Sequence, residues 1–195
     1  MKGLPRTVVT AALALAAVAQ SVPATQAGAP LRAQTVRMPS APDDPQVIEA
    51  LSIAQDGAFS AFAGVDRWFA VVDGAGVTLA LPDGDSALTG SSAPQHFAGE
   101  AAPHARLRAG ATQDLNLMVQ RDAGTGEMHR AAAGSAAPGH SAWRGLFSAD
   151  ALTLEVDGTS IAVDAGTLLW SASPSNAKWR VQEATRAWWL TWNPR

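Results

Sequence analysis

The feature that most limits the folds open to this chain is a series of short apolar segments separated by turn residues. The series runs from QVIEALSIA, which begins at Gln46, to RAWWLTW, which ends at Trp192. Many of these segments alternate apolar and polar residues, as half-buried antiparallel strands do. The joints carry turn sequences such as PDGD and VDGT. No stretch after the first thirty residues keeps a helical apolar period, so the pattern predicts many short strands in a sandwich or barrel.

Composition places the chain among globular proteins. Of its 195 residues, 47% are apolar and 16% are charged, which suits one domain or two small fused modules. The net charge of −3 and the lack of a basic stripe make nucleic acid a poor partner. With no Cys, the chain has no disulfide, no thiol nucleophile and no Cys-ligated zinc.

The first 29 residues differ from the rest and are typical of a secretory leader. The basic start MKGLPR precedes the uncharged run TVVTAALALAAVA, which is too short to span a bilayer. Small residues suited to signal-peptidase cleavage lie at Ala17–Ala19 and at Ala27–Ala29. We expect residues 1–29 to form a signal peptide and leader helix, and the mature protein to be periplasmic or secreted. The alternative is a misplaced start codon and a cytoplasmic protein.

Two strand-rich halves are expected within one domain that covers residues 30–195. They span about residues 46–121 and 141–195, and the Gly- and Ala-rich stretch from Arg121 to Ala142 is expected to connect them. VVDGAGVTLALPDG in the first half and LEVDGTSIAVDAGTLLW in the second both run strand, Gly turn, strand, turn. The second of these has the cadence typical of a cupin barrel.

The histidines do not form a metal-ligand motif. Cupin enzymes usually hold a metal with a His-x-His pair, a nearby Glu and a later His, which leave an open site for iron, manganese or zinc. Here His96, His104, His129 and His140 each stand alone. We expect no metal, no cofactor and a surface or loop position for each histidine. If the segment around His104 is a strand, the His104 side chain could face a barrel interior.

Catalytic motifs are also missing from the sequence. There is no G-x-S-x-G nucleophile elbow, no Gly-rich phosphate loop before a helix and no recognisable pair of carboxylates. We therefore expect no catalytic residue, and the sequence favours a non-enzymatic role.

Two stretches place polar side chains at positions that suit either a pocket or a solvent-exposed surface. DGAFSAFAGVDRWFAVVDGAG crowds aromatic residues around the neighbours Asp66 and Arg67, which suits either a pocket floor or a solvent-facing corner. In DLNLMVQR, strand alternation puts Asp114, Asn116 and Met118 on one face and the intervening aliphatic residues on the other. That polar face suits a lined pocket or a solvent-exposed surface, and the pattern alone favours the exposed surface.

These two stretches also carry a family resemblance. SIAQDGAFSAFAGVDRWFAVVDGAGVTL, then FAGE, then DLNLMVQR closely resemble, in order and spacing, the HutD/Ves family of small bicupin proteins. The match covers roughly Leu31 to Arg121, and the rest of the chain resembles the family only in strand cadence. The resemblance implies an all-β bicupin, with two fused cupin-like, RmlC-like β-barrel halves. Family members are linked to histidine utilisation or stress response and are thought to bind a small ligand without catalysis.

The resemblance also assigns residues to motif positions. Those it implies for ligand binding are Arg67, Asp114, Asn116 and Arg121. Those it implies for the structural motif are Asp56, Gly57, Phe59, Ser60, Phe62, Gly64 and Asp66. Arg67 would suit a carboxylate ligand, because its planar fork pairs two oxygens at once.

The sequence departs from the family pattern in two places. Ala58 and Ala63 replace two family prolines, which loosens a turn. LRAQTVRMPS resembles the family's N-terminal segment, but Ser40 replaces its Trp and the Lys-Asn-Gly-rich continuation is missing before Asp43. We therefore expect a diverged member whose ligand differs or has been lost.

The function favoured by the sequence is non-catalytic binding or sensing of a small carboxylate metabolite, related to histidine degradation by the resemblance. One alternative is an exported scaffold or interaction protein that kept the fold and lost the pocket. Another is a metal-independent cupin enzyme, which would need a positioned general acid or base. No nucleic acid and, after leader removal, no membrane is expected as a partner, and the oligomeric state stays open.

Overall fold

The computed structural model describes residues 9–12, 34–36, 46–139, 141–171, 177–183 and 186–195. The first elements are β1 (Val9–Ala12), β2 (Gln34–Val36), β3 (Gln46–Ile53), β4 (Gly57–Ala58), β5 (Val65–Asp73), β6 (Val77–Leu81), β7 (Gly84–Leu88), β8 (Gln95–Ala98), the 3-10 helix η1 (Gly99–Ala101), β9 (His104–Leu107) and β10 (Thr112–Gln120). They are followed by β11 (Gly124–Arg130), β12 (Trp143–Ser148), β13 (Leu152–Val156), β14 (Thr159–Val163), β15 (Thr167–Ser171), β16 (Trp179–Val181) and β17 (Ala187–Pro194). Over these residues, the chain has no helix with the length and apolarity needed to cross a membrane.

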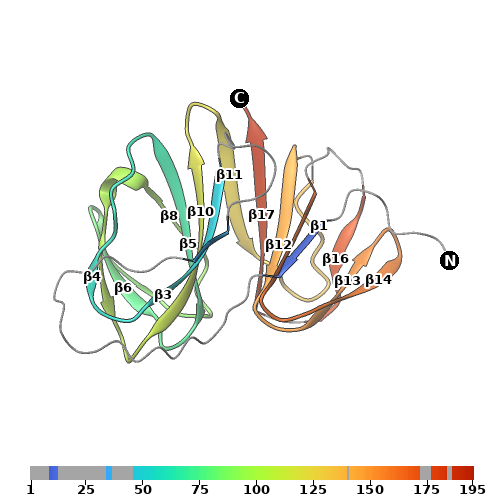
Figure 1. Ribbon diagram of the computed structural model, residues 1–195, viewed down its shortest axis with the longest axis horizontal. Coiled ribbons are helices and arrows are strands. Elements are labelled where there is room, and N and C mark those ends of the chain that lie inside the picture. Colours follow the sequence, from blue (N-terminus) through green and yellow to red (C-terminus); the bar gives the residue numbers. More distant parts are fainter. Residues whose placement is uncertain (1–8, 13–33, 37–45, 140, 172–176, 184–185) are drawn as a thin grey trace.

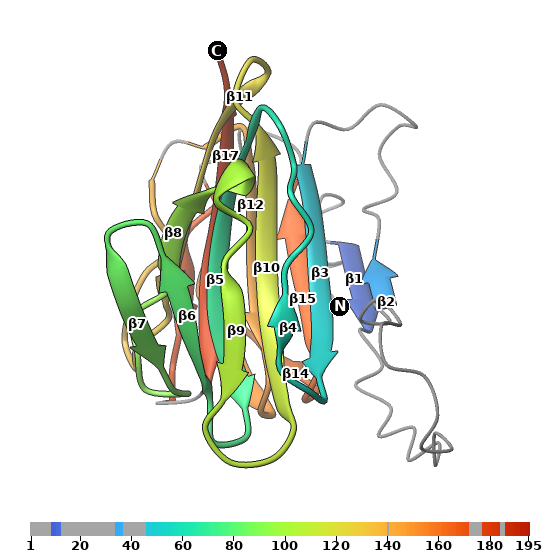
Figure 2. The same cartoon turned by 90° about the vertical axis from the view of Figure 1, so that its left-hand side faces the viewer.

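The strands form two halves that lie side by side, as Figure 1 shows. In the N-terminal half, the sheet β2-β3-β10-β5-β8 faces the smaller sheet β4-β9-β6-β7, which lies in front of it in Figure 2. In the C-terminal half, the sheet β1-β15-β12-β17-β11 is accompanied by β14-β13-β16. Every pairing between the named strands is antiparallel, so the predicted all-β bicupin is confirmed. We call the two halves the N-terminal and C-terminal barrels.

The two five-stranded sheets pack against each other and bury a central core between the barrels. Strand alternation selects its members, because every second side chain of a strand points to the same face. From the N-terminal sheet come Ile48, Ala70, Val72, Leu115, Leu117 and Val119, and from the C-terminal sheet Met128, Trp143, Phe147, Leu168, Trp170, Trp188 and Leu190.

Each barrel has a second core in its own interior. The N-terminal barrel is filled by residues that include Phe59, Phe69 and Leu79, and the C-terminal barrel by residues that include Leu146 and Trp189. Each large sheet is therefore buried on both faces, since one face belongs to the central core and the other to a barrel interior. This is why strands such as β5 carry long apolar runs with few alternating polar residues.

The two large sheets share one strand order. β3-β10-β5-β8 in the N-terminal barrel corresponds to β11-β17-β12-β15 in the C-terminal barrel. The hairpin β6-β7 then corresponds to β13-β14. The two similar sequences noted above are not equivalent in this order, because Asp73 ends β5 and Gly74 follows it, whereas Asp157-Gly158 turns the β13-β14 hairpin.

Two segments differ from the expectation. The stretch from Arg121 to Ala142 contains strand β11, which pairs with β17 and places Met128 in the central core. Because the stretch is rich in Gly and Ala, its sequence did not indicate a strand. Its partner, β17, lies far along the chain. In the leader, the structure describes Val9–Ala12 as strand β1 on the edge of β15 and not as helix. Backbone groups at a sheet edge are free to pair with an extended segment, which favours a strand there.

Side chains also join the two barrels directly. Trp68 on β5 donates its indole N–H to the carbonyl of Gly126 on β11, at 2.8 Å. Arg186, before β17, bonds the Asp73 carboxylate of the N-terminal barrel at 2.7 Å and the Asp150 carboxylate of its own barrel at 2.6 Å.

Candidate functional site

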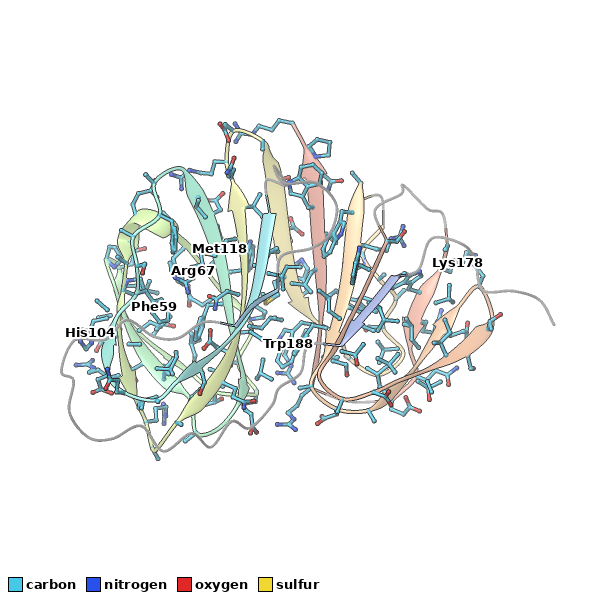
Figure 3. The ribbon with its side chains drawn as sticks, in the orientation of Figure 1. Phe59, Arg67, His104, Met118, Lys178 and Trp188 are labelled. Carbon is cyan, nitrogen blue, oxygen red and sulfur yellow. The ribbon has the colours of Figure 1, made fainter. Side chains whose placement is uncertain are left out.

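Arg67 lies inside the N-terminal barrel. Alternation along β5 sends Trp68 and Ala70 towards the central core, so Arg67 and Phe69 point into the barrel. The side chain is 4% exposed. Its guanidinium carbon lies 4.4 Å from the ring centre of Phe59 and 5.7 Å from that of Phe97, within cation–π range. Figure 3 shows Arg67 and Phe59 in this interior.

A short hydrogen-bond chain joins Arg67 to β10. The Arg67 Nε–H donates to Asn116 Oδ1 at 2.8 Å, and Asn116 Nδ2 donates to Asp114 Oδ2 at 2.6 Å. Both β10 side chains are buried, so the exposed strand face that the pattern alone favoured is wrong. The alternation itself is confirmed, because Leu115 and Leu117 occupy the opposite face in the central core. We call Arg67, Asn116 and Asp114 the polar chain.

The polar chain brings opposite charges into a weakly polar interior. A buried guanidinium is costly unless it is paired and hydrogen-bonded, and here an amide links it to a carboxylate. The bond from Nε fixes the plane of the guanidinium, and the Phe59 ring lies against it. A cation held in a fixed plane is suited to pairing with a carboxylate, whose two oxygens match its fork.

Arg121 lies apart from the polar chain, on the barrel rim just after β10. Its guanidinium bonds both oxygens of Glu100, the Val65 carbonyl at 2.9 Å and Asp66 Oδ1 at 3.3 Å. We call Arg121, Glu100 and Asp66 the rim network. The hydrogen bonds from Arg121, and then one from the Gly64 N–H, lower the pKa of Glu100 to about 2. The same hydrogen bonds to Glu100 and Asp66 raise the pKa of Arg121.

The structure therefore brings three of the four predicted ligand residues together and gives the fourth a different environment. Arg121 closes the junction of β10, β5 and η1. A shallow surface pocket of about 410 Å³ beside it is lined by Ala63, Gly64, Val65, Gln120, Arg121 and Asp122. The contacts of Arg121 with two carboxylates and a carbonyl hold the rim together.

The family-motif residues before Arg67 form the loop that leads into β5. Asp56 accepts the Leu107 N–H at 2.8 Å, and Gly57 pairs with Ala105 on β9. Phe59 is buried against Phe69, with ring centres 5.6 Å apart. These contacts tie the loop to the smaller sheet and hold the Phe59 ring against Arg67.

The second part of this loop is anchored to η1. The Phe62 N–H donates to the Gly99 carbonyl at 3.0 Å, while the Phe62 side chain and Ser60 are exposed. Gly64 has φ +72°, a left-handed conformation that favours glycine, and its N–H donates to Glu100. The exposed Ser60 has no role in the interior.

The described histidines lie on the surface. His104 is on β9 but its side chain is exposed, so the option of an inward-facing histidine is wrong, as Figure 3 also shows. His96 stacks near Trp68 with ring centres 4.8 Å apart, and His129 Nε2 lies 2.9 Å from Glu127. His140 falls outside the described residues. The part of the chain that the structure describes has no group of three or more His, Asp or Glu side chains placed to hold a metal.

Two residues of the site were not predicted from the sequence. Phe97 covers Arg67 from β8, and Glu100 anchors Arg121. Both lie in the FAGE segment, so that family block was a signal for them, although it gave neither residue a role. The gap between Ser40 and Asp43, where the family's Lys-Asn-Gly-rich stretch is missing, lies outside the described residues.

Comparison with known families shows to which family the chain belongs. The HutD family model matches residues 50–189, which is most of the chain. The chain belongs to the HutD family. The predicted resemblance is thereby confirmed, and it extends well beyond Arg121 into the C-terminal barrel. No curated protein matches the chain.

Solved structures show the same fold at low sequence identity. PA5104 of Pseudomonas aeruginosa PAO1, a conserved protein of unknown function, is 20% identical with a TM-score of 0.68, covering 77% of this chain and 84% of that one. HutD from Pseudomonas fluorescens SBW25 is 20% identical with a TM-score of 0.66, covering 77% and 80%. A salicylate 1,2-dioxygenase from Pseudaminobacter salicylatoxidans is 9% identical with a TM-score of 0.55, covering 84% and 76%. At these identities the likeness concerns the fold alone.

Proposed function

We propose that this HutD-family protein binds a small carboxylate metabolite in its N-terminal barrel, with Arg67 as the principal contact and no catalysis. The observation that carries the proposal is the buried guanidinium, which Asn116 orients and the rings of Phe59 and Phe97 flank. Stability alone gives little reason for such a group, since apolar residues in place of a buried ion pair are often neutral or stabilising.

The family relationship supports histidine-degradation metabolites as the first ligands to test. Urocanate, histidine and formylglutamate all carry a carboxylate that Arg67 is able to pair. Asn116 and Asp114 would orient the guanidinium. Arg121 would act on the ligand only indirectly, by holding the barrel rim.

The scaffold alternative also has one observation in its favour. Arg67 already donates to Asn116, and Asn116 to Asp114, so the polar chain forms hydrogen bonds without a ligand. A protein that lost its ligand while keeping the fold would retain these bonds for stability. Binding measurements separate the two functions.

The test is a thermal-shift screen of the purified protein against urocanate, histidine, formylglutamate and other small carboxylates, followed by calorimetric titration. Arg67→Lys keeps the charge but removes the fork, and exposed Arg108→Lys is the matched control. Loss of a charged contact in a desolvated site costs about 2–5 kcal/mol, or roughly 30- to several-thousand-fold in affinity. We expect Arg67→Lys to show such a loss and Arg108→Lys to bind as the parent does. Absence of binding to every carboxylate, or equal binding by Arg67→Lys, would refute the proposal.

We further propose that the protein is exported and loses its leader. The support is the sequence of residues 1–29, with its basic start and small-residue cleavage positions. Cleavage after either position removes β1 and leaves the edge of β15 without that strand. Intact mass of protein from the cell envelope and the cytoplasm tests this, and an uncleaved Met1 on a cytoplasmic protein would contradict it.

A further inference from the structure

The C-terminal barrel also contains a buried arginine, Arg144, on the strand that corresponds to β5. In the shared strand order, β12 corresponds to β5 and β17 to β10. Met118 on β10 pairs with Arg67, and Thr191 on β17 pairs in the same way with Arg144 on β12. Arg144 is buried at 6% exposure, close to the 4% of Arg67.

Alternation directs Arg144 into the barrel interior. Trp143 and Phe147 of β12 belong to the central core, whereas Leu146 belongs to the interior of the C-terminal barrel. Arg144 lies on the same face as Leu146. Its Nη1 donates to the carbonyl of Ala177 at 2.9 Å.

Two hydroxyl side chains flank Arg144 in one row across the sheet. Ser171 on β15 pairs with Arg144 from one side, and Thr191 on β17 pairs with it from the other. Both lie on the face of Leu169 and Trp189, which belong to the barrel interior. Directly opposed side chains in adjacent antiparallel strands have Cβ atoms about 4.5–5.5 Å apart, so each hydroxyl lies beside the base of the Arg144 side chain.

The Ser171 hydroxyl provides an independent sign of a ligand. Ser171 is 2% exposed, and its Oγ has no hydrogen-bond partner among the described residues. A buried hydroxyl without a partner is destabilising, so such a group indicates a missing partner. Burial also lowers the pKa of Arg144, with an opposing effect from Asp157, so the strand paired with Ser171 carries a desolvated cation.

The row around Arg67 in the N-terminal barrel is different. There Arg67 lies between Phe97 and Met118, an aromatic ring and a thioether. The hydroxyls around Arg144 are both donors and acceptors and are suited to oxygen atoms, while the positive guanidinium selects a negative ligand.

We propose that the C-terminal barrel holds a second carboxylate-binding site, formed by Arg144 with the hydroxyls of Ser171 and Thr191. It lies outside the proposed function, which concerns Arg67 in the other barrel. A small carboxylate fits this row because the arginine fork pairs its oxygens and the Ser171 hydroxyl donates to one of them.

The test follows the arginine Nε–H signals in two-dimensional NMR of the full chain. Acetate is titrated to about 100 mM, enough to saturate a millimolar site, at constant ionic strength with chloride as the balancing anion. The Arg144 signal is identified by its loss in Arg144→Lys, and the Arg67 signal by its loss in Arg67→Lys. We expect a saturable shift of the Arg144 signal with acetate. No saturable shift, or the same shift with chloride alone, would overturn the proposal.

Substitutions at the flanking hydroxyl give a second measure that avoids removing the charge. Ser171→Ala should weaken acetate binding at the Arg144 signal about tenfold, as expected for a lost hydrogen bond to a charged group. Ser148→Ala is the matched control, because Ser148 is buried on β12 but donates to the Asp150 carbonyl. Equal acetate affinity in Ser171→Ala and the parent would contradict the proposed site.

The same titrations separate this site from the proposed function. In Arg67→Lys, the acetate shift at Arg144 should persist, since the two arginines lie in different barrels. Disappearance of the Arg144 response in folded Arg67→Lys protein would overturn an independent second site. A persistent response supports it, whether or not the Arg67 signal itself responds to a ligand.

Discussion

At the scale of single residues, the buried arginines have the greatest chemical interest. The Arg67 guanidinium lies against an aromatic ring and donates a hydrogen bond to an amide. These two contacts fix both the plane and the direction of the guanidinium. Arg121, only a few residues beyond Asn116, is instead held by carboxylates at the rim. Similar guanidinium groups thus have different roles because one is enclosed by the barrel and the other lies at its edge.

Replacement of Arg67 by Ala should destabilise the protein strongly. The substitution leaves the buried Asp114 and Asn116 without the cation, and breaking a buried ionic network of this kind costs about 3–5 kcal/mol. Exposed Arg108→Ala should stay within about 0.5 kcal/mol of the parent. Urea unfolding measures the stability of both variants. A change of under 0.5 kcal/mol in the free energy of unfolding of Arg67→Ala would show that Arg67 does not stabilise the fold.

The rim network should make stability depend on pH in the acid range. Hydrogen bonds from Arg121 and Gly64 lower the pKa of Glu100 from 4.5 to about 2 in the folded protein. The folded state therefore favours the carboxylate, and its contribution is complete above pH 4.5 and is lost as pH falls towards about 2. Glu100→Gln should lose less stability than the parent across this window.

The measurement is the urea midpoint as a function of pH, with Glu155→Gln as a control that removes a carboxylate on β13, away from the rim network. Parallel pH curves for the parent and Glu100→Gln would show that the rim network does not stabilise the fold.

At the scale of elements, the packing of β11 on β10 depends on a glycine. A Cβ added to Gly126 would lie 2.6 Å from Val119 Cγ2 and 3.2 Å from the Thr191 carbonyl oxygen. The Gly126 carbonyl also accepts the Trp68 indole N–H from the other barrel. The glycine therefore allows two sheets to approach at the point where a side chain joins them.

Gly126→Ala should separate these strands and destabilise the protein by about 1–3 kcal/mol, the usual cost of an overpacked contact. Gly90→Ala is the control, because a Cβ there meets nothing within 4 Å. Thermal unfolding gives the comparison. An unchanged melting temperature in Gly126→Ala would mean that the strands shift without cost.

At the scale of the whole molecule, the central core makes the two barrels interdependent. Leu117 from one sheet and Trp188 and Leu190 from the other lie in the same cluster (Figure 3 labels Trp188). Neither large sheet can bury this face alone, so exposing it in one barrel exposes it in the other. Arg186 adds polar links at the edge, which are worth less because they are partly exposed.

We predict that the barrels unfold in one transition. Six of the seven tryptophans follow residue 140, so tryptophan fluorescence reports mainly on the C-terminal barrel. Leu117→Ala in the N-terminal barrel should cost about 2–5 kcal/mol and shift the fluorescence midpoint as much as the circular dichroism midpoint. Separate midpoints for the two signals would show that the barrels unfold independently.

The sequence alone determined many of the strands and the division of their faces. Period-two alternation in DLNLMVQR separated Asp114, Asn116 and Met118 from the aliphatic residues, because successive side chains leave a strand in opposite directions. The family resemblance predicted Arg67 and Asn116 for one ligand site, and the structure joins them by a hydrogen bond.

Only the tertiary structure decided which face is enclosed. Alternation divides a strand into two faces but does not say whether water or another sheet covers the polar one. The smaller sheet encloses Asp114 and Asn116, and the central core covers the other face. β11 and the row around Arg144 were missed for the same reason, since their partners β17 and β15 lie far along the chain. Such long-range pairings arise from the closing of sheets around a shared core, and no local pattern of residues encodes them.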